Sequence, residues 1–461
     1  MTRIPRVCVA AGASGAGKTA FTCALLRALT NAGKRPASFK AGPDYIDPMF
    51  HEKALGIPGA NLDLYLMDEK TAALLLREHG EGRDIAVLEG VMGFYDGIGA
   101  VSPAGSTWDL ARATNTPVVL VEDCRGMSLS IVPRIKGLSE FRVPSGIGAV
   151  VLNRASGKLY PRLKQAVEDE TGIPVAGYLP YLPECRIESR HLGLVTAFEL
   201  ADIGEKIDRL AASLAAHVDM ALITALAESA PLLDAAPPLP HTGRFAGVKV
   251  AVARDRAFCF YYKDNLALLE KLGAELAYFS PLSHTALPEG TQGLYLGGGY
   301  PELYAGELAG NRRLLAAVRE ALDSGLPCIA ECGGFMYLHS TLVDANGKSH
   351  ALVGFLPGSC APQKGLVRFG YAAYTAQRDT VLCAKGETLR GHEFHYWESD
   401  APGDAFVSQK PFTPETGQCA VAGETLYAGF PHFHFYTNPA MASRFLQKSA
   451  AYHPPPPAGG G

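Results

Sequence analysis

The stretch GASGAGKT at residues 12–19 restricts the fold of this 461-residue chain more than any other segment. It matches the phosphate-loop pattern G-x-x-x-x-G-K-[ST] and lies between a strand-like run, RVCVAA, and a helix-like run, AFTCALLRALTNAG. Gly15 and Gly17 allow backbone N–H groups to converge on phosphate oxygens at a helix N-terminus. Lys18 can neutralise phosphate charge, and the Thr19 hydroxyl can bind Mg²⁺. A tight turn that binds nothing is the alternative, but the flanking runs favour a nucleotide-binding α/β domain.

Short apolar runs alternate with longer helical stretches along the first half of the chain, which predicts βαβ units and a parallel sheet. This rhythm stops in ESAPLLDAAPPLPHTGR, where prolines among small residues are typical of a linker. It resumes with VKVAVARD, GLYLGGG and PCIAEC, which indicates a second α/β domain. We therefore expect domains at residues 1–235 and 246–450, a linker at 236–245, and a disordered tail at 451–461, where the sequence reads PPPPAGGG.

Composition excludes several classes of protein. Apolar residues make up 48% of the chain and charged residues 19%, which is typical of a globular protein. The net charge of −4 gives no basic field for nucleic acid or anionic membranes, and no apolar run is long enough to span a bilayer. The ten cysteines are scattered without CxxC pairs, so we expect mostly buried, reduced thiols and a cytoplasmic protein.

Two carboxylates could complete a magnesium site beside the phosphate loop. Glu89 closes the buried-looking strand DIAVLEG at its carboxyl end, where ligands gather in open α/β sheets. Asp63, in NLD, is a second candidate. For each acid, a solvated or helix-capping role is the alternative.

The segment FKAGPDYIDPMFH places one cation, two acids and a tyrosine near each other, namely Lys40, Asp44, Asp47 and Tyr45. Proline with aspartate is ordinary turn chemistry. Such a loop could also hold the carboxylate of an electrophile beside a γ-phosphate, with Lys40 offsetting the charge. The stretch by itself leaves both interpretations open.

Cys332 follows the apolar run PCIA and precedes two glycines and a predicted helix, so it occupies a sharp strand-to-helix turn. We expect this turn to expose the sulfur at a helix N-terminus, where the dipole favours thiolate over thiol. A buried structural cysteine is the alternative. Gly298 and Gly299, at the end of the neighbouring predicted strand, could present backbone N–H groups to a developing oxyanion.

A thiolate nucleophile needs a base, and the segment GFPHFHFYTN offers His432 and His434. Strand alternation would put both on the same face. His392 and His395, in RGHEFHY, compete for the role. A zinc site is disfavoured because the spacing lacks a further cysteine partner.

In their order along the chain, these motifs resemble those of the cobyrinic acid a,c-diamide synthases, the glutamine-dependent amidotransferases of cobalamin biosynthesis. The resemblance extends from about residue 7 to residue 436 and depends on GASGAGKT, FKAGPDYIDPMFH, NLD, LEGVMGFYDG, RHLGLV, FYYKDN, LGGGYPELYA, AECGGFMYL, RFGY and RGHEFHY. It implies an α/β fold with an N-terminal phosphate-loop domain, a doubly wound parallel sheet similar to that of dethiobiotin synthetase. It also implies a C-terminal α/β domain of the class I-type glutamine amidotransferases.

The resemblance also implies roles for individual residues. The implied sites are Lys18 and Lys40 for the phosphates of ATP, Asn153 for its adenine, Thr19, Asp63 and Glu89 for Mg²⁺, Asp44, Tyr45 and Asp96 for the substrate carboxylate, and Cys332 with His432 as nucleophile and base.

Two positions depart from the family pattern. The family usually has a small residue and a tyrosine ahead of the base, where this chain has Phe430 and Pro431. The H-P-E element of many class I glutaminases, whose glutamate orients the histidine, is absent because His434 stands in the glutamate position. The third member of the triad is therefore unassigned.

The implied reaction is ATP- and glutamine-dependent amidation of the a and c acetate carboxylates of cobyrinic acid. A carboxylate is a poor electrophile, so γ-phosphoryl transfer would first convert it to an acyl phosphate. Ammonia released from glutamine inside the protein would escape protonation by bulk water. Because the chain is mildly acidic, the corrin carboxylates need local partners, for which the candidates are Arg190, His191, Arg368 and Arg390.

Other functions share some of these features. The same chemistry could act on hydrogenobyrinic acid or a nickel sirohydrochlorin. A cobyric acid synthase-like enzyme is disfavoured by GPDYIDPMFH and RGHEFHY. A partitioning-type ATPase, which uses the phosphate loop as a dimerisation switch, would leave Cys332 without a task. A homodimer is one expected assembly.

Overall fold

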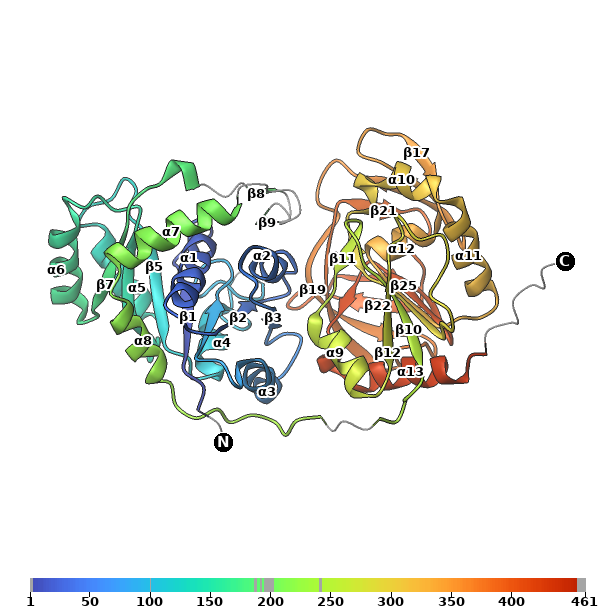
Figure 1. The fold of residues 1–461 in the computed structure, drawn as a ribbon, viewed down its shortest axis with the longest axis horizontal. Coiled ribbons are helices and arrows are strands. Elements are labelled where there is room, and N and C mark those ends of the chain that lie inside the picture. Colours follow the sequence, from blue (N-terminus) through green and yellow to red (C-terminus); the bar gives the residue numbers. More distant parts are fainter. Residues whose placement is uncertain are drawn as a thin grey trace. The chain divides into compact units, whose positions relative to one another are not determined.

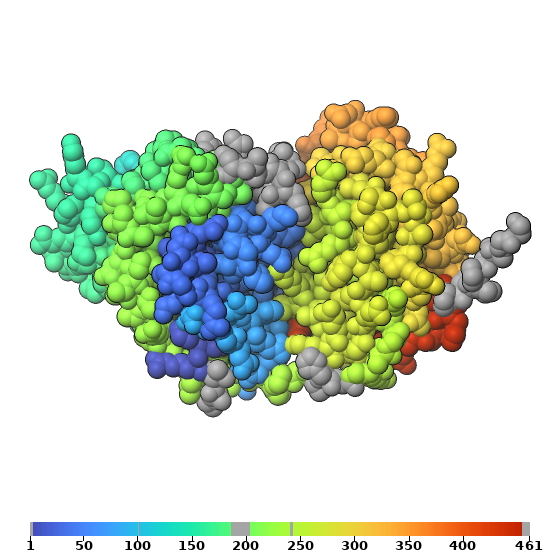
Figure 2. Space-filling model, in the orientation of Figure 1, coloured from blue at the N-terminus to red at the C-terminus, as the bar shows by residue number. Residues whose placement is uncertain are grey.

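The computed structural model describes residues 3–99, 101–185, 189–190, 193–194, 203–239 and 243–453. The chain divides into two units, Met1–Pro238 and Leu239–Gly461. Consecutive residues build each unit, with blue to green in the first and yellow to red in the second (Figures 1 and 2). Each unit is an α/β fold, as predicted.

The first unit is built on a seven-stranded sheet of order β3-β2-β4-β1-β5-β6-β7. Every neighbouring pair is parallel, and the strands are almost wholly buried because helices cover both faces. The strands are β1 (Arg6–Ala10), β2 (Pro36–Ala41), β3 (Gly59–Leu62), β4 (Ile85–Glu89), β5 (Val118–Asp123), β6 (Ile147–Asn153) and β7 (Val175–Leu179). The predicted doubly wound parallel sheet is confirmed.

The helices of the first unit bury apolar faces against this sheet. Side chains from α1, α7 and α8 share one hydrophobic core with β1, β4, β5 and β6. The helices are α1 (Lys18–Asn31), α2 (Ile46–Leu55), α3 (Glu69–Gly80), α4 (Thr107–Ala113), α5 (Ile131–Glu140), α6 (Tyr160–Thr171), α7 (Ile203–His217) and α8 (Met220–Glu228). Shorter pieces are η1 (Pro183–Cys185), β8 (Ser189–Arg190) and β9 (Gly193–Leu194). This arrangement leaves the carboxyl ends of β1, β2 and β4 to meet the phosphate loop.

The second unit has a central sheet of order β12-β10-β13-β15-β25-β24, parallel except for the last pair. Its strands are β10 (Lys249–Ala253), β12 (Glu275–Phe279), β13 (Gly293–Leu296), β15 (Cys328–Glu331), β24 (Val421–Gly423) and β25 (Leu426–Gly429). Its helices are α9 (Lys263–Lys271), α10 (Ala305–Gly310), α11 (Arg312–Asp323), α12 (Gly333–Leu338) and α13 (Ala440–Ala451), with η2 (Pro301–Leu303) and η3 (Phe435–Thr437). Residues of β13, β15, α11 and α12 form the main core of this unit.

Further strands of the second unit form three smaller sheets that the alternating βα rhythm did not predict. The five-stranded sheet β23-β22-β19-β20-β26 is antiparallel throughout, the sheet β17-β16-β18-β21 is mixed, and β11 pairs with β14. These strands are β11 (Phe258–Phe260), β14 (Gly298–Gly299), β16 (His339–Val343), β17 (Ser349–Ala351), β18 (Leu356–Pro362), β19 (Arg368–Ala376), β20 (Thr388–His395), β21 (Trp397–Ser399), β22 (Phe406–Gln409), β23 (Thr416–Cys419) and β26 (His432–Phe433). The five-stranded sheet carries His432, the predicted base.

Within the described part of the chain, no helix combines the length and apolar character needed to cross a bilayer. All ten cysteines lie among the described residues as free thiols, and all but Cys259 are buried, as expected. The predicted linker begins in contact with the first unit, since Ala236 N donates to Lys70 O and Arg77 donates to Ala236 O. Residues 454–461 of the predicted tail lie outside the described residues.

Candidate active site

The phosphate loop connects β1 to α1 and needs its glycines. Gly15 and Gly17 have φ of 75° and 101°, in the left-handed region that favours glycine. A Cβ on Gly17 would lie only 2.2 Å from Asn153 Nδ2. Asn153 ends β6 and donates to Ala16 O at 2.7 Å, so the structure brings this predicted adenine contact against the loop.

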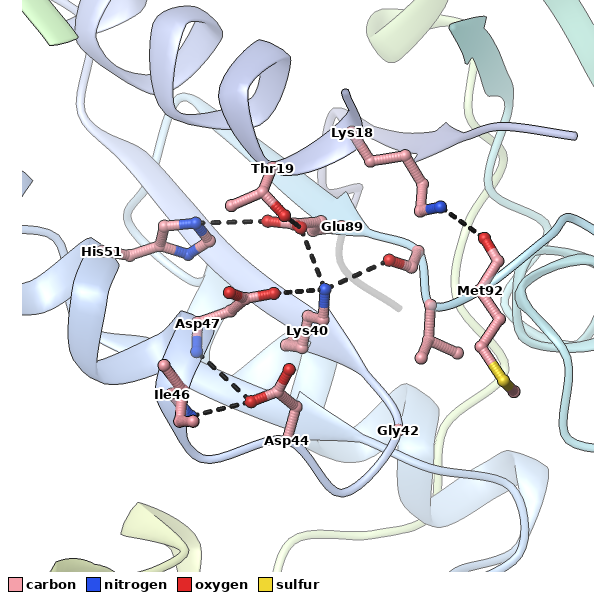
Figure 3. A network of polar contacts seen from close by, with 12 residues as sticks. Lys18, Thr19, Lys40, Gly42, Asp44, Ile46, Asp47, His51, Glu89 and Met92 are labelled. Carbon is pink, nitrogen blue, oxygen red and sulfur yellow. Dashed lines mark hydrogen bonds and ion pairs between the residues drawn. The ribbon is translucent and has the colours of Figure 1, made fainter. Parts of the chain in front are cut away.

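Lys18 begins α1 and points toward the loop that follows β4 (Figure 3). Its Nζ donates to Met92 O and, at 3.3 Å, to Ala13 O. Burial, followed by the positive charge of Lys40, lowers the pKa of Lys18 to about 8, and Asp96 is near enough to oppose that shift. Phosphate oxygens would be stronger partners for this ammonium than two carbonyl groups.

Lys40 is the centre of a buried polar network at the ends of β2 and β4 (Figure 3). Its Nζ lies 2.5 Å from Asp47 Oδ2 and 2.9 Å from Glu89 Oε1, and donates to Gly90 O at 3.2 Å. Burial alone would lower the pKa of Lys40, but the two carboxylates outweigh burial and raise it. Burial would likewise raise the pKa of Glu89, yet Lys40 and hydrogen bonds hold it well below its usual value. The network therefore keeps Lys40 and Glu89 charged.

Thr19 and Glu89 lie together as the magnesium prediction requires. Thr19 Oγ1 donates to Glu89 Oε1 at 2.5 Å, while His51 Nε2 lies 3.3 Å from Glu89 Oε2. His51 is fixed in turn by Ser38, with Nδ1 and Oγ 2.7 Å apart. The donor set suits Mg²⁺, which takes oxygen ligands and usually binds through one or two carboxylates, waters and phosphates. Among the described residues no group of three or more His, Cys, Asp or Glu side chains forms a ready-made metal cage.

Asp63, the other predicted magnesium ligand, is buried in a turn after β3. Its Oδ1 accepts hydrogen bonds from Tyr65 N at 2.8 Å and Leu66 N at 3.1 Å. These bonds occupy one carboxylate oxygen in a buried turn, which differs from the solvated or helix-capping alternative, and the magnesium role of Asp63 stays a prediction.

Two of the three predicted contacts to the substrate carboxylate, Asp44 and Asp96, are held by local hydrogen bonds. Asp44 Oδ1 accepts from Ile46 N at 2.8 Å, so Asp44 lies just before the start of α2 (Figure 3). Tyr45 is the residue that immediately precedes that helix. Asp96 Oδ2 accepts from Gly93 N at 2.8 Å. Asp44 lies in the Lys40 network and Asp96 on the Lys18 side, so both border the phosphate loop.

Cys332 stands in the second unit between β15 and α12, at the predicted strand-to-helix turn. Its φ of 48° and ψ of −99° are strained for a residue with a side chain, a feature that clusters at functional sites. The neighbouring glycines allow close packing, since a Cβ on Gly334 would lie 2.3 Å from Leu296 O. A Cβ on Gly333 would lie 3.1 Å from Gly299 N, so the predicted nucleophile and oxyanion segments adjoin.

The expectation of an exposed thiolate at Cys332 is wrong for this structure. The residue is only 8% exposed, and α12 has six residues, too few for a strong dipole. Burial raises the pKa of the Cys332 thiol, Glu302 and Glu331 raise it further, and only the N–H of Gly333 lowers it. The raised pKa favours the protonated thiol, so the predicted nucleophilic role requires that the sulfur lose its proton.

His432 is the histidine that the fold brings to the predicted oxyanion segment. It lies on β26, opposite His392 of β20. A Cβ on Gly298 would lie 2.7 Å from His432 Cε1, so the imidazole covers this glycine. Gly297 N donates to Tyr261 Oη at 2.8 Å, which leaves Gly298 and Gly299 as the candidate oxyanion donors of the triplet.

Glu331, which the sequence did not single out, faces His432 from the end of β15. Its Oε2 lies 3.5 Å from His432 Nδ1, and the glutamate is 1% exposed. Phe433 N donates to Glu331 Oε1 at 3.2 Å, and Tyr295 Oη donates to Oε2 at 3.3 Å. The signal that could have revealed Glu331 was a charged residue at the end of an apolar strand, directly before the predicted nucleophile Cys332.

The other histidines have different partners. β26 ends at Phe433, so alternation does not carry to His434, whose Nε2 lies 3.6 Å from Asp264 Oδ2 of α9. His395 stacks on Phe430 at a ring separation of 3.8 Å and donates from Nδ1 to Trp397 O at 2.7 Å. Burial, followed by His432, lowers the pKa of His392 to about 3.

Asn265 of α9 fixes the segment that carries His432. Its Nδ2 donates to Phe433 O at 2.8 Å, and its Oδ1 accepts from Phe435 N at 2.7 Å. The side-chain amide thus replaces a neighbouring strand at the end of β26. Pro431, the departure from the family pattern, accepts a hydrogen bond from Tyr427 Oη at 2.9 Å through its carbonyl group.

The predicted cationic contacts to the substrate are less fully described. Arg368 begins β19 near Glu393. Burial would raise the pKa of the Glu393 carboxyl group, but His395 first and Arg368 after it lower that pKa. Only the backbone of Arg190 is described, in β8, and His191 lies outside the described residues.

Two family models match the chain. Residues 7–195 match the CobQ/CobB/MinD/ParA nucleotide binding domain, and residues 249–440 match the CobB/CobQ-like glutamine amidotransferase domain. A cobyrinate a,c-diamide synthase of Thermoplasma volcanium is 39% identical over 98% of this chain and 98% of its own. One of Dehalococcoides mccartyi is 37% identical over 97% and 99%, and one of Listeria innocua is 38% identical over 95% and 97%.

Proposed function

The chain belongs to the family of cobyrinate a,c-diamide synthases, and on this basis we propose that it amidates the a and c acetate carboxylates of cobyrinic acid with ATP and glutamine. One observation supports the proposal above all. Cys332, His432 and Gly298 converge in the second unit, and the first unit of the same chain holds the phosphate loop with Thr19 and Glu89. We assign carboxylate activation to residues 1–235 and glutamine hydrolysis to residues 246–450, joined by the linker 236–245.

Carboxylate activation requires neutralisation of the phosphates of ATP. Lys18 and Lys40 supply two ammonium groups, of which Lys40 is held charged by its carboxylate partners. Thr19 and Glu89 are the residues that would hold Mg²⁺, which when bound neutralises charge on the phosphoryl oxygens. Transfer of the γ-phosphoryl group to the substrate carboxylate yields an acyl phosphate, which ammonia attacks to give the amide and inorganic phosphate.

Glutamine hydrolysis begins at Cys332. As its sulfur attacks the carboxamide carbon, the thiol proton passes to His432, which then delivers it to the departing ammonia. The N–H groups of Gly298 and Gly299 are the proposed donors to the oxyanion. Water then hydrolyses the thioester, releases glutamate and restores the thiol.

We infer that Glu331 is the third member of this triad. Its carboxylate faces Nδ1 of His432, so it can orient the ring and stabilise the imidazolium that forms when the thiol proton arrives. The two further contacts of Glu331 fix its own position. This arrangement places the acid on the nucleophile strand, not after the histidine.

The proposal is tested by incubating the enzyme with ATP, Mg²⁺, glutamine and a panel of tetrapyrrole acids that includes cobyrinic acid, hydrogenobyrinic acid and nickel sirohydrochlorin. Mass measurement should show two amides gained on cobyrinic acid. A Cys332→Ser variant should lose glutamine use but keep amidation at high external ammonia. Unchanged glutamine use by that variant would refute the assignment of Cys332.

A partitioning-type ATPase switch is the weaker alternative, because it gives no task to the Cys332 site. We place the enzyme in the cytoplasm, since its ten free thiols are typical of a reducing compartment. The expected homodimer is tested by sedimentation equilibrium.

A further inference from the structure

Glu302 lies beside the nucleophile in the short helix η2, which follows β14. A Cβ on Gly333 would lie 3.0 Å from Pro301 Cδ, so η2 packs directly against the turn that presents Cys332. Glu302 also raises the pKa of the Cys332 thiol more than any other charged group does, second only to burial. Glu302 therefore lies in a helix that packs against the turn presenting the sulfur, and its charge acts on the thiol.

Three acidic residues influence Cys332, and two of them have a histidine partner. Glu331 faces His432 at 3.5 Å, and Glu393 faces His395 at 3.3 Å. Within the described ranges, Glu302 forms no ion pair with a Lys, Arg or His side chain, and burial raises the pKa of its carboxyl group to about 7. A desolvated carboxylate without a cation is unfavourable, so its charge is available to a cationic ligand.

Glu302 is half-buried as a residue, so it is not sealed from solvent although its carboxyl group is largely desolvated. Under the proposed function, the ligand that approaches Cys332 is glutamine, whose carboxamide must meet the sulfur. The same molecule carries one cationic group, the α-ammonium, at its other end. A carboxylate beside the nucleophile can therefore recognise glutamine while the amide carbon lies at the sulfur.

We propose that the Glu302 carboxylate binds the α-ammonium group of glutamine and selects for it over amides that lack this group. The inference rests on the proposed glutaminase function of Cys332. It also explains how a resting thiol becomes reactive, because an ammonium bound to Glu302 cancels the negative field that this residue imposes on the sulfur. Glutamine thereby promotes ionisation of the cysteine that attacks it.

The test compares L-glutamine with 4-carbamoylbutanoate, which has the same amide and carboxylate but no α-amino group. Ammonia release is measured for the wild type, Glu302→Gln and a control, Glu307→Gln, whose carboxylate is exposed in α10 and pairs with Arg256 at 3.6 Å. For Glu302→Gln we expect kcat/KM for glutamine to fall about 10- to 100-fold, mainly through KM, as for loss of a hydrogen bond to a charged group. Values for the analogue should stay within about threefold of wild type, measured as Ki where turnover is too slow.

Equal losses on both substrates would overturn the proposal, because they indicate a structural role. Unchanged glutamine kinetics would overturn it as well. Amidation with external ammonia shows that each variant is folded, and Glu302→Ala serves as a second variant if Glu302→Gln fails that check. A wild-type enzyme that does not hydrolyse glutamine would instead refute the proposed function, which keeps the two failures distinguishable.

Discussion

Replacing Gly298 by alanine should separate the use of glutamine from the use of ammonia. The backbone of Gly298 does not have a positive φ, so alanine is compatible with its conformation. The added methyl group, however, would lie 2.7 Å from His432 Cε1 and 3.2 Å from Phe260 Cβ. The substitution therefore acts through the imidazole.

The size of the effect follows from this contact. Carbon atoms pack at about 3.5–4.0 Å, so the imidazole must move by about 1 Å. His432 cannot move freely, since Glu331 faces its Nδ1 and Asn265 fixes the adjoining backbone. A misplacement of about 1 Å at a reacting group can lower the rate about 100-fold. We expect kcat for glutamine hydrolysis to fall by that factor.

Two assays on the same preparation measure the outcome. Glutamine hydrolysis should fall, while ATP-dependent amidation with external ammonia stays at the wild-type rate. Gly306→Ala is the matched control, because its Cβ would meet another histidine, His350, at an ordinary contact distance of 3.5 Å in α10. Glutamine hydrolysis within threefold of wild type in Gly298→Ala would refute the placement of His432 over the oxyanion segment.

Three further predictions follow from the same contacts. Glu331→Gln keeps the shape of the side chain but removes its charge. The kcat with glutamine should therefore fall about 10- to 100-fold, while amidation with external ammonia is unchanged. Equal glutamine rates for the variant and the wild type would contradict the proposed triad. Thr19→Val removes the hydroxyl that contacts Glu89, and a magnesium titration of ATP-dependent amidation should show a half-saturating concentration raised at least about tenfold. Because burial raises the pKa of Cys332, the thiolate fraction of this residue should increase with pH throughout the neutral range. Alkylation of Cys332 by iodoacetamide, followed by peptide mass mapping, should therefore accelerate about tenfold per pH unit from about pH 7 to 9. A plateau of the alkylation rate within that window would show a lower pKa.

Local patterns were sufficient where one segment determines its own structure. The phosphate loop needs a strand, a glycine turn and a helix in immediate succession, and β1 and α1 flank it as predicted. The turn at Cys332 likewise needs a strand, glycines and a helix in succession, and β15 and α12 flank it as predicted. In both places the chemistry depends on backbone geometry within a few residues, which glycine spacing reveals.

Contacts between distant segments could not be predicted in this way. Glu331 and His432 meet because β26 pairs with β20 and β15 pairs with β25, and no local pattern specifies that combination. The protonation state of Cys332 was mispredicted for the same reason, since η2 and β15 supply the burial and the negative charge around it. The buried turn at Asp63, where the carboxylate accepts two backbone N–H groups, was likewise not predicted from residue type.

The adjacency of Glu331 and Cys332 has a mechanical consequence. Two of the three proposed triad residues are neighbours in sequence at the end of β15, so any shift of that strand would move them together. The imidazole is carried by β26, a two-residue strand that pairs with β20 and is fixed at its end by Asn265 and Glu331. Under the proposed function, the rate of ammonia release would therefore depend on how the imidazole of His432 is positioned relative to the adjacent Glu331 and Cys332.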